Sequence, residues 1–338
     1  MTREVDEARL TGTVFAAADA MLRRSSGYRS FQAGQAAAAD YYLVVDALAE
    51  ELVSAGVPPT DIPFLKRMPR NPVAFVGRIL ADLQHRDLIE SAVYDAALAQ
   101  RTAEMMTRFR HGPYKTYIYP EEGLLLAALA DICAPRNALF LGSYYGYWAH
   151  WAIPAIVAAG GQVTLVDPNE SCCEVARRNL HQEGFAAAVK VVVARGERFL
   201  CEAGGTFDFI VLDAENPRDH PEPEQRGKRV YGSLTRACLP HMAPGALFVC
   251  HNILFTDRTG DPAFSGIIGR NRDELGPFAR LVARAFGPFV EFRTTEGVGI
   301  GRHTGRPRHH PACQDLWPIP ADLDDAPLPD PHRRGASW

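Results

Sequence analysis

The sequence predicts an α/β fold in which helices cover both faces of a largely parallel sheet, preceded by a helical region. From residue 137 onward, short apolar runs alternate with amphipathic stretches, a spacing typical of βαβ units. Before residue 113, apolar side chains recur at intervals of three and four residues, as on one face of a helix. The chain of 338 residues is 47% hydrophobic, which is enough apolar material for a large core.

Residues 1–112 are expected to form an all-helical N-terminal domain. Apolar residues at helical spacing run through 36–55 and 73–83. Breaks between helices are expected at the Ser-Ser-Gly of 25–27 and in the proline-rich stretch 58–72. We interpret this domain as a cap or a dimerisation element, which could also close over a site on the following domain.

Strands and helices then alternate along the chain. After the fifth strand we expect a helix over 272–286 and an antiparallel hairpin over 289–302 at the sheet edge. Residues 304–338 are rich in proline, histidine, arginine and aspartate without periodicity, and we expect an extended tail. The five strands are expected over 137–143, 162–168, 189–194, 207–214 and 245–254, and the helices over 147–159, 170–183, 197–202 and 222–241.

Composition excludes several classes of protein. With 36 Lys and Arg against 40 Asp and Glu, the chain lacks the basic footprint of a nucleic-acid-binding protein. It has no run near 18 apolar residues and no apolar segment at its start, so we expect neither a membrane span nor a secretory signal. Seven cysteines without a C-x-x-C pair indicate a reducing compartment, and we expect a cytoplasmic protein.

Polar residues gather where the predicted strands end. In a doubly wound sheet, ligands bind at the carboxyl ends of the strands, where the strand order reverses. The first strand leads into a glycine-bearing turn at 142–146, which would allow a ligand close to the backbone. The second strand ends at Asp167, an acid placed to accept hydrogen bonds from a ribose. The fourth ends at Asp213, and the fifth at His251 and Asn252.

These strand ends, in this order and spacing, resemble the class I S-adenosylmethionine (SAM) dependent methyltransferases, and most closely the catechol O-methyltransferase-like family. The resemblance covers 117–302 and implies a Rossmann-like, seven-stranded sheet of order 3-2-1-4-5-7-6. With it, we place the SAM-binding catalytic domain at 113–303, between the helical domain and the tail. The segments that carry the resemblance are YPEEGLLLAALADI (119–132), VDPN (166–169), LDAEN (212–216), PGALFVCHNIL (244–254) and TTEGVGIGR (294–302).

The resemblance also implies contacts to SAM. The turn after the first strand would lie along the methionine part, and Asp167 would hold the ribose hydroxyls. A helix N-cap is the alternative role for Asp167, since a helix opens just after it. Glu122 would contact the amino group of the cofactor, and Arg195, Gly196 and Glu197 would lie near its adenine. The implied cofactor-binding residues are Glu122, Gly142, Ser143, Tyr144, Gly146, Asp167, Pro168, Asn169, Arg195, Gly196, Glu197 and Asp213.

The turn after the first strand departs from the family pattern, because it is crowded with aromatic residues. An aromatic face attracts a cation such as the sulfonium of SAM by roughly 0.5–2 kcal/mol. We therefore predict that Tyr144 and Tyr145 contact the sulfonium and count them among the catalytic residues. Trp151 is expected to pack against the sheet instead.

A second departure concerns metal binding. Metal-dependent members of the family hold a divalent ion, usually magnesium, at positions that correspond to Asp213, His251 and Asn252. Magnesium prefers oxygen ligands, and imidazole is a poor substitute; zinc, iron or manganese would suit this set better. We favour a metal-free site in which His251, together with Asp213, takes or holds the acceptor proton. Tyr117, Tyr119 and Asn252 are expected to contact the substrate.

The leading functional hypothesis is a SAM-dependent methyltransferase of specialised metabolism that acts on a small molecule. Attack at a different carbon of the sulfonium gives two alternatives that release methylthioadenosine. One is a cyclase that forms azetidine-2-carboxylate from SAM, and the other is a 3-amino-3-carboxypropyl transferase. A non-catalytic SAM-binding regulator is a further alternative. The sequence also allows a homodimer through the N-terminal helices or the sheet edge.

Overall fold

A seven-stranded sheet of order β3-β2-β1-β4-β5-β7-β6 organises the molecule, which confirms the predicted strand order. The computed structural model describes residues 13–112 and 118–303. β1 to β5 run parallel, and β7 pairs antiparallel with both β5 and β6, as the predicted edge hairpin requires. The strands are β1 (Asn137–Leu141), β2 (Gln162–Asp167), β3 (Val189–Val193), β4 (Phe207–Leu212), β5 (Met242–Cys250), β6 (Phe286–Phe292) and β7 (Val298–His303).

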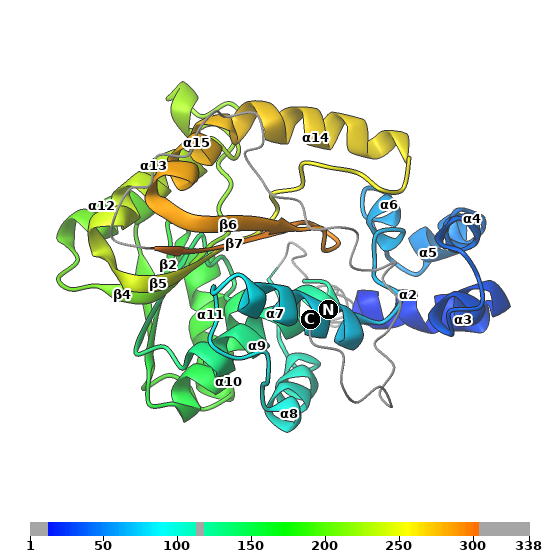
Figure 1. The fold of residues 1–338 in the computed structure, drawn as a ribbon, viewed down its shortest axis with the longest axis horizontal. Helices are drawn as coiled ribbons and strands as arrows, with labels where there is room; N and C mark the ends of the chain where they lie inside the picture. The colour runs from blue at the N-terminus through cyan, green and yellow to red at the C-terminus, as the bar shows by residue number, and fades with distance from the viewer. Residues whose placement is uncertain (1–12, 113–117, 304–338) are drawn as a thin grey trace, which may run out of the picture.

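Helices cover both faces of this sheet, with a separate core on each face. Because side chains alternate along a strand, Ala138 and Phe140 of β1 enter one core and Leu139 and Leu141 the other. The first core contains residues of α7 (Pro72–His85), α8 (Ala96–Met106), α9 (Pro120–Cys133), α10 (Tyr147–Ala158) and α11 (Glu170–Gln182), and the second residues of α12 (Gly196–Glu202), α13 (Val230–Cys238) and α15 (Gly276–Ala285). Figure 1 shows the two helical layers above and below the sheet.

The N-terminal helices form a third core at one end of the sheet (Figure 1). Tyr41 lies at its centre, stacks on Phe31 and donates a hydrogen bond to the carbonyl oxygen of Leu65 at 2.6 Å. Tyr119, next to the first turn of α9, belongs to the same core and links it to the sheet region. The helices are α2 (Thr13–Arg24), α3 (Ser26–Gln32), α4 (Ala38–Ala47), α5 (Ala49–Ser54) and α6 (Ile62–Leu65).

Two predicted helices differ from the observed ones. The helix expected over 222–241 is α13 flanked by the short 3-10 helices Pro223–Gln225 and Leu239–His241, because prolines and Gly227 interrupt the helical hydrogen bonds before Val230. The helix expected over 272–286 is two helices, α14 (Pro262–Glu274) and α15, which meet at Gly276 and Pro277. Proline fits the first turn of α15 but not the interior of a longer helix.

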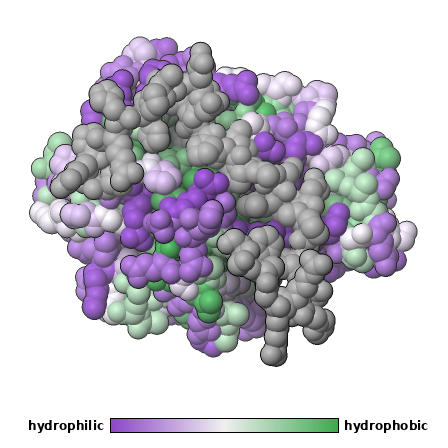
Figure 2. Space-filling view, in the orientation of Figure 1, coloured by the Kyte–Doolittle hydropathy of each residue, from purple (hydrophilic) through white to green (hydrophobic). Residues whose placement is uncertain are grey.

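The face of the molecule seen in Figure 2 is mixed in polarity where it is coloured. Figure 2 shows hydrophilic and hydrophobic residues interspersed, with pale hydrophobic residues at the right edge, where Figure 1 places the N-terminal helices. Leu43 of α4 is exposed there, with 68% of its surface accessible. Among the described residues, no helix has both the length and the apolar character needed to cross a bilayer. The predicted extended tail and Tyr117 lie outside the described residues.

Candidate active site

The turn between β1 and α10 brings the backbone close to the neighbouring strand end. Gly142 has a φ of 73°, and a Cβ at this position would lie 2.3 Å from the carbonyl oxygen of Asp213, so only glycine fits. Tyr144 also has a left-handed backbone, with a φ of 48°. The hydroxyl oxygen of Ser143 is buried and has no hydrogen-bond partner in the described part of the chain. The turn therefore offers a ligand the Ser143 hydroxyl and a stretch of backbone at Gly142 that no side chain covers.

Asp167 lies beside this turn at the end of β2. One carboxylate oxygen accepts a hydrogen bond from the backbone N–H of Tyr144 at 2.9 Å, and the other accepts one from Asn169 N–H at 2.9 Å. Asn169 provides the N-cap of α11, because its side chain accepts from Cys172 N–H at 3.2 Å. The carboxylate of Asp167 is therefore held rigidly, and Asn169 rather than Asp167 caps the helix. Burial raises the pKa of Asp167, and the hydrogen bonds from the two N–H donors partly offset this increase.

A cavity of about 550 Å³ opens over these strand ends. One end is lined by the turn after β1 and by the residues that follow β2, including Gly142, Tyr144, Asp167, Pro168 and Asn169. The other end is lined by residues after β4 and β5 and by the β6–β7 turn, including Asp213, Lys228, Tyr231, His251, Asn252 and Glu296. Asp61 of the N-terminal region, Tyr119 and Glu215 also line the cavity. The structure thus places the predicted residues Gly142, Tyr144, Asp167, Asp213, His251 and Tyr119 around one cavity.

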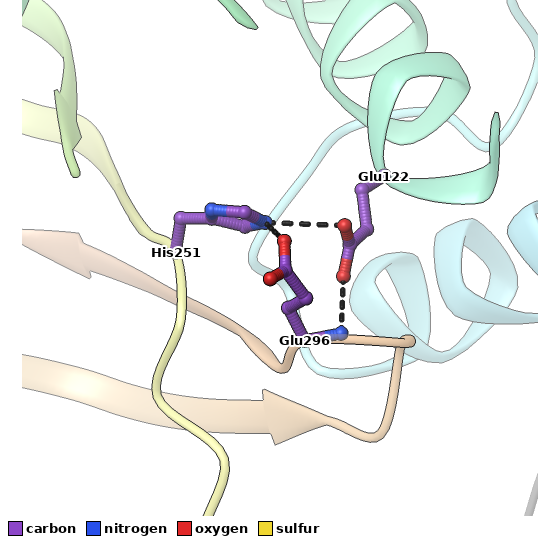
Figure 3. Close-up of side chains that lie close together, drawn as sticks. All are labelled: Glu122, His251 and Glu296. Atoms are coloured by element: carbon purple, nitrogen blue, oxygen red, sulfur yellow. Dashed lines mark hydrogen bonds and ion pairs between the residues drawn. The ribbon is translucent and has the colours of Figure 1, made fainter. Parts of the chain in front are cut away.

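His251 lies at the second end of the cavity, which the residues after β4 and β5 line, and it has carboxylates on both sides of its ring. Its Nδ1 is 3.4 Å from Asp213 Oδ2, and its Nε2 is 3.1 Å from Glu122 Oε2 and 3.6 Å from Glu296 Oε2. Figure 3 shows the Nε2 side, with Glu122 reaching in from α9 and Glu296 from the β6–β7 turn. Burial lowers the pKa of His251, but Asp213 and Glu122 raise it more strongly, and the pKa lies well above its usual value. This arrangement holds a proton on the imidazole.

Backbone structure explains how His251 and Asn252 reach this position. His251 N–H donates to Leu212 O at 3.0 Å and so extends the pairing of β5 with β4 by one residue. Asn252 then adopts a φ of 58°, a left-handed conformation that asparagine tolerates better than most residues. Its side-chain amide lies 3.2 Å from His251 Nδ1, and its carbonyl oxygen accepts a hydrogen bond from Lys228 Nζ. The backbone carbonyl of Asn252 therefore fixes the ammonium of Lys228 at this end of the cavity.

Glu122 lies behind His251 instead of on the cavity wall. It lies in the first turn of helix α9, where a negative charge is favourable. Its Oε1 accepts hydrogen bonds from Thr294 Oγ1 and from Glu296 N–H, both at 2.7 Å, and Oε2 faces His251. The side chain is fully buried. Both oxygens are thus occupied by protein groups, and the predicted contact with the cofactor amino group stays a prediction.

The predicted metal ligands are a poor match for magnesium. Asp213 provides the only carboxylate among Asp213, His251 and Asn252, and its lowered pKa comes from His251, which outweighs the effect of burial. Glu122, His251 and Glu296 form a second group of possible ligands. This group shares the imidazole with the first, and both carboxylate oxygens of its Glu122 already have hydrogen-bond partners in the protein.

The aromatic residues of the turn divide into two roles. Tyr144 lines the cavity, and its hydroxyl lies 3.2 Å from that of Tyr145, which is only 2% exposed. Burial raises the pKa of Tyr144, so its phenol is neutral at physiological pH. Trp148 donates a hydrogen bond to the carbonyl oxygen of Glu122, and Trp151 is buried in the core that α9 and α10 share, as expected. Tyr144 is therefore the tyrosine of this turn that faces the main cavity.

The predicted adenine contacts lie beside the cavity. Arg195, Gly196 and Glu197 follow β3 at the same sheet edge, and Ala194 N–H donates to Asp167 O at 3.1 Å. Glu197 accepts hydrogen bonds from Ser233 Oγ at 2.8 Å and Gln225 Nε2 at 3.1 Å. None of the three predicted residues lines the cavity, and their contact with adenine stays a prediction.

Sequence reasoning did not single out four charged residues on the wall, which are Asp61, Glu215, Lys228 and Glu296. Lys228 belongs to a charged stretch that resembles an ordinary solvated loop, and Glu296 lies in a hairpin turn, where acids are common. Asp61 is in the N-terminal region, far from the cavity in sequence. Only the presence of an acid within the hairpin segment that resembles the family could have drawn attention to Glu296.

Comparisons with known proteins find similar sequences and structures. Residues 139–253 match a family model described as a methyltransferase domain. A catechol O-methyltransferase from Niastella koreensis is 26% identical over 159 residues, which cover 44% of this chain and 66% of that protein. The chain therefore spans just under two thirds of the length of this curated relative.

Two solved structures are also similar. A SAH-bound methyltransferase from Podospora anserina is 17% identical and has a TM-score of 0.48; the match covers 62% of this chain and 88% of that one. An O-methyltransferase from Bacillus cereus in complex with SAH is 16% identical and has a TM-score of 0.44, with 67% and 97% covered.

Proposed function

Since residues 139–253 are a class I methyltransferase domain of the catechol O-methyltransferase-like family, we propose that this protein is a SAM-dependent enzyme that transfers a methyl group to a small molecule. The observation that carries the proposal is the rigid carboxylate of Asp167. Two backbone N–H groups fix it at the wall of a cavity whose far end bears Asp213, Lys228 and Glu296.

The residues at the first end of the cavity fit SAM. Asp167 is placed to accept hydrogen bonds from the two ribose hydroxyls, as acids at this position of a doubly wound sheet do. The glycine at 142 lets the methionine part pass close to the backbone, and the unpartnered hydroxyl of Ser143 is available to it. The ring of Tyr144 would attract the sulfonium cation. When bound, SAM supplies an electrophilic methyl carbon.

Positioning would account for much of the rate, because methyl transfer requires in-line approach of the acceptor to the methyl carbon. His251 holds Asp213 on one side of its ring and Glu296 on the other, and both carboxylates line the cavity. Since the imidazole already carries a proton, we assign His251 to positioning, and the acceptor proton would pass to a wall carboxylate. Lys228 stands beside them and supplies a positive charge.

The second candidate function is attack at the aminocarboxypropyl carbon of SAM, with release of methylthioadenosine. In its intramolecular form, the α-amine of SAM would close the ring of azetidine-2-carboxylate. What favours it is the ion-pair network of Asp213, His251 and Glu122, which occupies the place where a metal would bind a catechol-like acceptor. Transfer of the aminocarboxypropyl group to an external acceptor would use the same carbon.

Mass spectrometry of purified protein incubated with SAM separates these functions. Methyl transfer predicts intact SAM when no acceptor is added, and S-adenosylhomocysteine once a mixture of small phenols and amines is present. Cyclisation predicts equal amounts of methylthioadenosine and a cyclic amino acid from SAM alone. Protein that neither binds nor consumes SAM would contradict both. Heat-denatured protein is the control, because SAM also decomposes slowly without an enzyme.

A further inference from the structure

Tyr144 has an unusual backbone conformation at the cavity wall. Its φ of 48° is left-handed, which is uncommon for a bulky residue and persists only where the surrounding structure fixes it. One fixing contact is the hydrogen bond from its backbone N–H to the carboxylate of Asp167. Because this bond holds the main chain and does not set the direction of the side chain, other groups must orient the ring.

The ring of Tyr145 lies directly against the ring of Tyr144. The two ring centroids are 4.0 Å apart, and the planes of the rings are tilted by 40°. The hydroxyl oxygens are 3.2 Å apart, which is long for an O–H···O hydrogen bond, so the contact between the rings is the closer fit. Tyr145 is buried and therefore supports the ring of Tyr144 from inside the protein.

A second cavity next to the turn leaves these rings room to shift. It has a volume of about 50 Å³, and Tyr144, Tyr145, Tyr147 and Trp148 are among the residues that line it. Protein interiors are close-packed, so a ring that borders such a space is held by the contacts on its other sides. The contacts of Tyr145 therefore decide where the ring of Tyr144 lies.

Gly112 supplies one of these contacts. A Cβ at this position would lie 2.4 Å from Cζ and 2.4 Å from the hydroxyl oxygen of Tyr145, closer than a Cβ atom can come. The backbone of Gly112 thus lies directly against the ring of Tyr145, and any larger residue would displace that ring.

Two helices anchor the segment that carries Gly112. The side chain of Asn179, on α11, accepts a hydrogen bond from Arg110 N–H at 3.0 Å and donates one to the carbonyl oxygen of Arg110 at 2.8 Å. Phe109 packs edge-on against His150 of α10, with ring centroids 4.8 Å apart. Gly112 therefore provides a fixed support for the ring of Tyr145.

We infer that Tyr145 is a positioning residue: supported by Gly112, its ring holds the ring of Tyr144 in the orientation that faces the sulfonium of SAM. The face of an aromatic ring is negative and its edge is positive, so the attraction of a cation depends on how the ring is turned. The neutral sulfur of S-adenosylhomocysteine gains nothing from this orientation. The pair of tyrosines therefore favours SAM over the demethylated product. This inference rests on the proposed function, because it concerns the cofactor end of the same cavity.

Calorimetry with SAM and with S-adenosylhomocysteine tests this role, and the quantity to compare is the ratio of the two affinities. The two ligands differ in the charge at sulfur and in one methyl group. In Tyr145→Leu we expect the affinity for SAM, relative to that for S-adenosylhomocysteine, to fall about fivefold. Tyr145→Phe keeps the ring, and its ratio should stay within about twofold of wild type. The affinity for S-adenosylhomocysteine should stay within about twofold in both variants, which also shows that they are folded.

Gly112→Ala is a second test that leaves both tyrosines in place. The added methyl group would displace the ring of Tyr145, so the ratio of affinities should fall as it does in Tyr145→Leu. Gly204→Ala is the matched control, because Gly204 is exposed and a Cβ there would meet no atom within 4 Å. Its ratio should equal that of wild type.

The outcomes separate this inference from the proposed function. A ratio that falls in Tyr144→Ala but is unchanged in Tyr145→Leu and Gly112→Ala would overturn the inference and leave the sulfonium contact in place. Equal losses of affinity for both ligands would give Tyr145 a purely structural role and would also overturn it. A fall in Tyr145→Phe as large as that in Tyr145→Leu would assign the effect to the hydroxyl and contradict the role of the ring. Failure of the wild-type protein to bind either ligand would overturn the proposed function itself.

Discussion

His251 Nε2 lies 3.1 Å from Glu122 Oε2, and this pair joins the end of β5 to the first turn of α9. Glu122 also accepts hydrogen bonds from Thr294 and Glu296 in the β6–β7 turn. One buried carboxylate therefore connects three segments that are distant in sequence. Through it, the imidazolium and the turn that presents Glu296 are held in a fixed relation.

Replacing Glu122 by glutamine should weaken this connection. The amide keeps the size of the side chain but removes the charge that His251 faces, and breaking a buried pair on one side costs roughly 3 kcal/mol. We expect the free energy of unfolding in urea to fall by about that amount and the pKa of His251, followed by NMR, to decrease. The exposed Glu202→Gln should change neither quantity; a Glu122→Gln protein as stable as wild type would show that the pair contributes little.

Arg67 docks the N-terminal helices onto the β6–β7 turn. Its guanidinium is fully buried and donates to the carbonyl oxygens of Thr295 at 2.9 Å and Thr294 at 3.3 Å, and it lies 3.3 Å from Asp257. Arg67→Met keeps much of the volume but leaves these acceptors unpaired, at a cost of roughly 3 kcal/mol.

Hydrogen exchange measured by mass spectrometry should show faster exchange over 293–298 in Arg67→Met than in wild type. The exposed Arg198→Met is the matched control. Equal exchange in all three proteins would mean that the turn is held without Arg67.

The protein should lose stability as the pH rises from about 4.5 to 8, because of Glu121. Burial raises the pKa of this side chain from 4.5 to about 8, and the neighbouring Glu122 raises it further, against the hydrogen bonds from Thr295. The folded state therefore binds more protons than the unfolded state within this window, so the contribution to stability is complete below pH 4.5 and is lost as the pH passes 8. Melting temperatures between pH 5 and 9 should decline less steeply in Glu121→Gln. Parallel curves for the two proteins would rule out this titration.

Substitutions at Tyr144 test the contact with the sulfonium. Tyr144→Phe keeps the aromatic face and should bind SAM with an affinity within about threefold of wild type, whereas Tyr144→Ala should bind about tenfold more weakly. Because both variants lose the hydroxyl contact with Tyr145, they form a matched pair. Calorimetry with SAM measures the difference, and equal affinities of the two variants would exclude a cation–π role.

The sheet and the clustering of its strand-end residues follow from the sequence, because parallel strands bring their carboxyl ends to a single edge. The spacing of the strands therefore predicts that Gly142, Asp167, Asp213 and His251 lie together, as observed. Which groups surround His251 could not be predicted in the same way. The approach of Glu122 and Glu296 depends on how α9 and a hairpin turn pack against the sheet, and such long-range packing leaves no periodic signal.

The charge state of His251 follows from this unpredicted packing. A histidine at a strand end, considered alone, has a pKa near neutral and is a reasonable base. Surrounded by Asp213, Glu122 and Glu296, it keeps its proton. The position of Asp61 on the cavity wall could not be predicted either, since it depends on how the N-terminal helices dock against the strand ends.

The most direct test of the central claim is calorimetric titration of SAM into the wild-type protein and Asp167→Asn. The amide keeps the shape of the side chain but is a weaker acceptor for the ribose hydroxyls, and hydrogen bonds to a charged group contribute about 1.5–3 kcal/mol. We predict that wild type binds SAM, that Asp167→Asn binds it at least about tenfold more weakly, and that the exposed Asp219→Asn matches wild type. Equal affinity of the wild type and Asp167→Asn would contradict the assignment of this cavity as a SAM site.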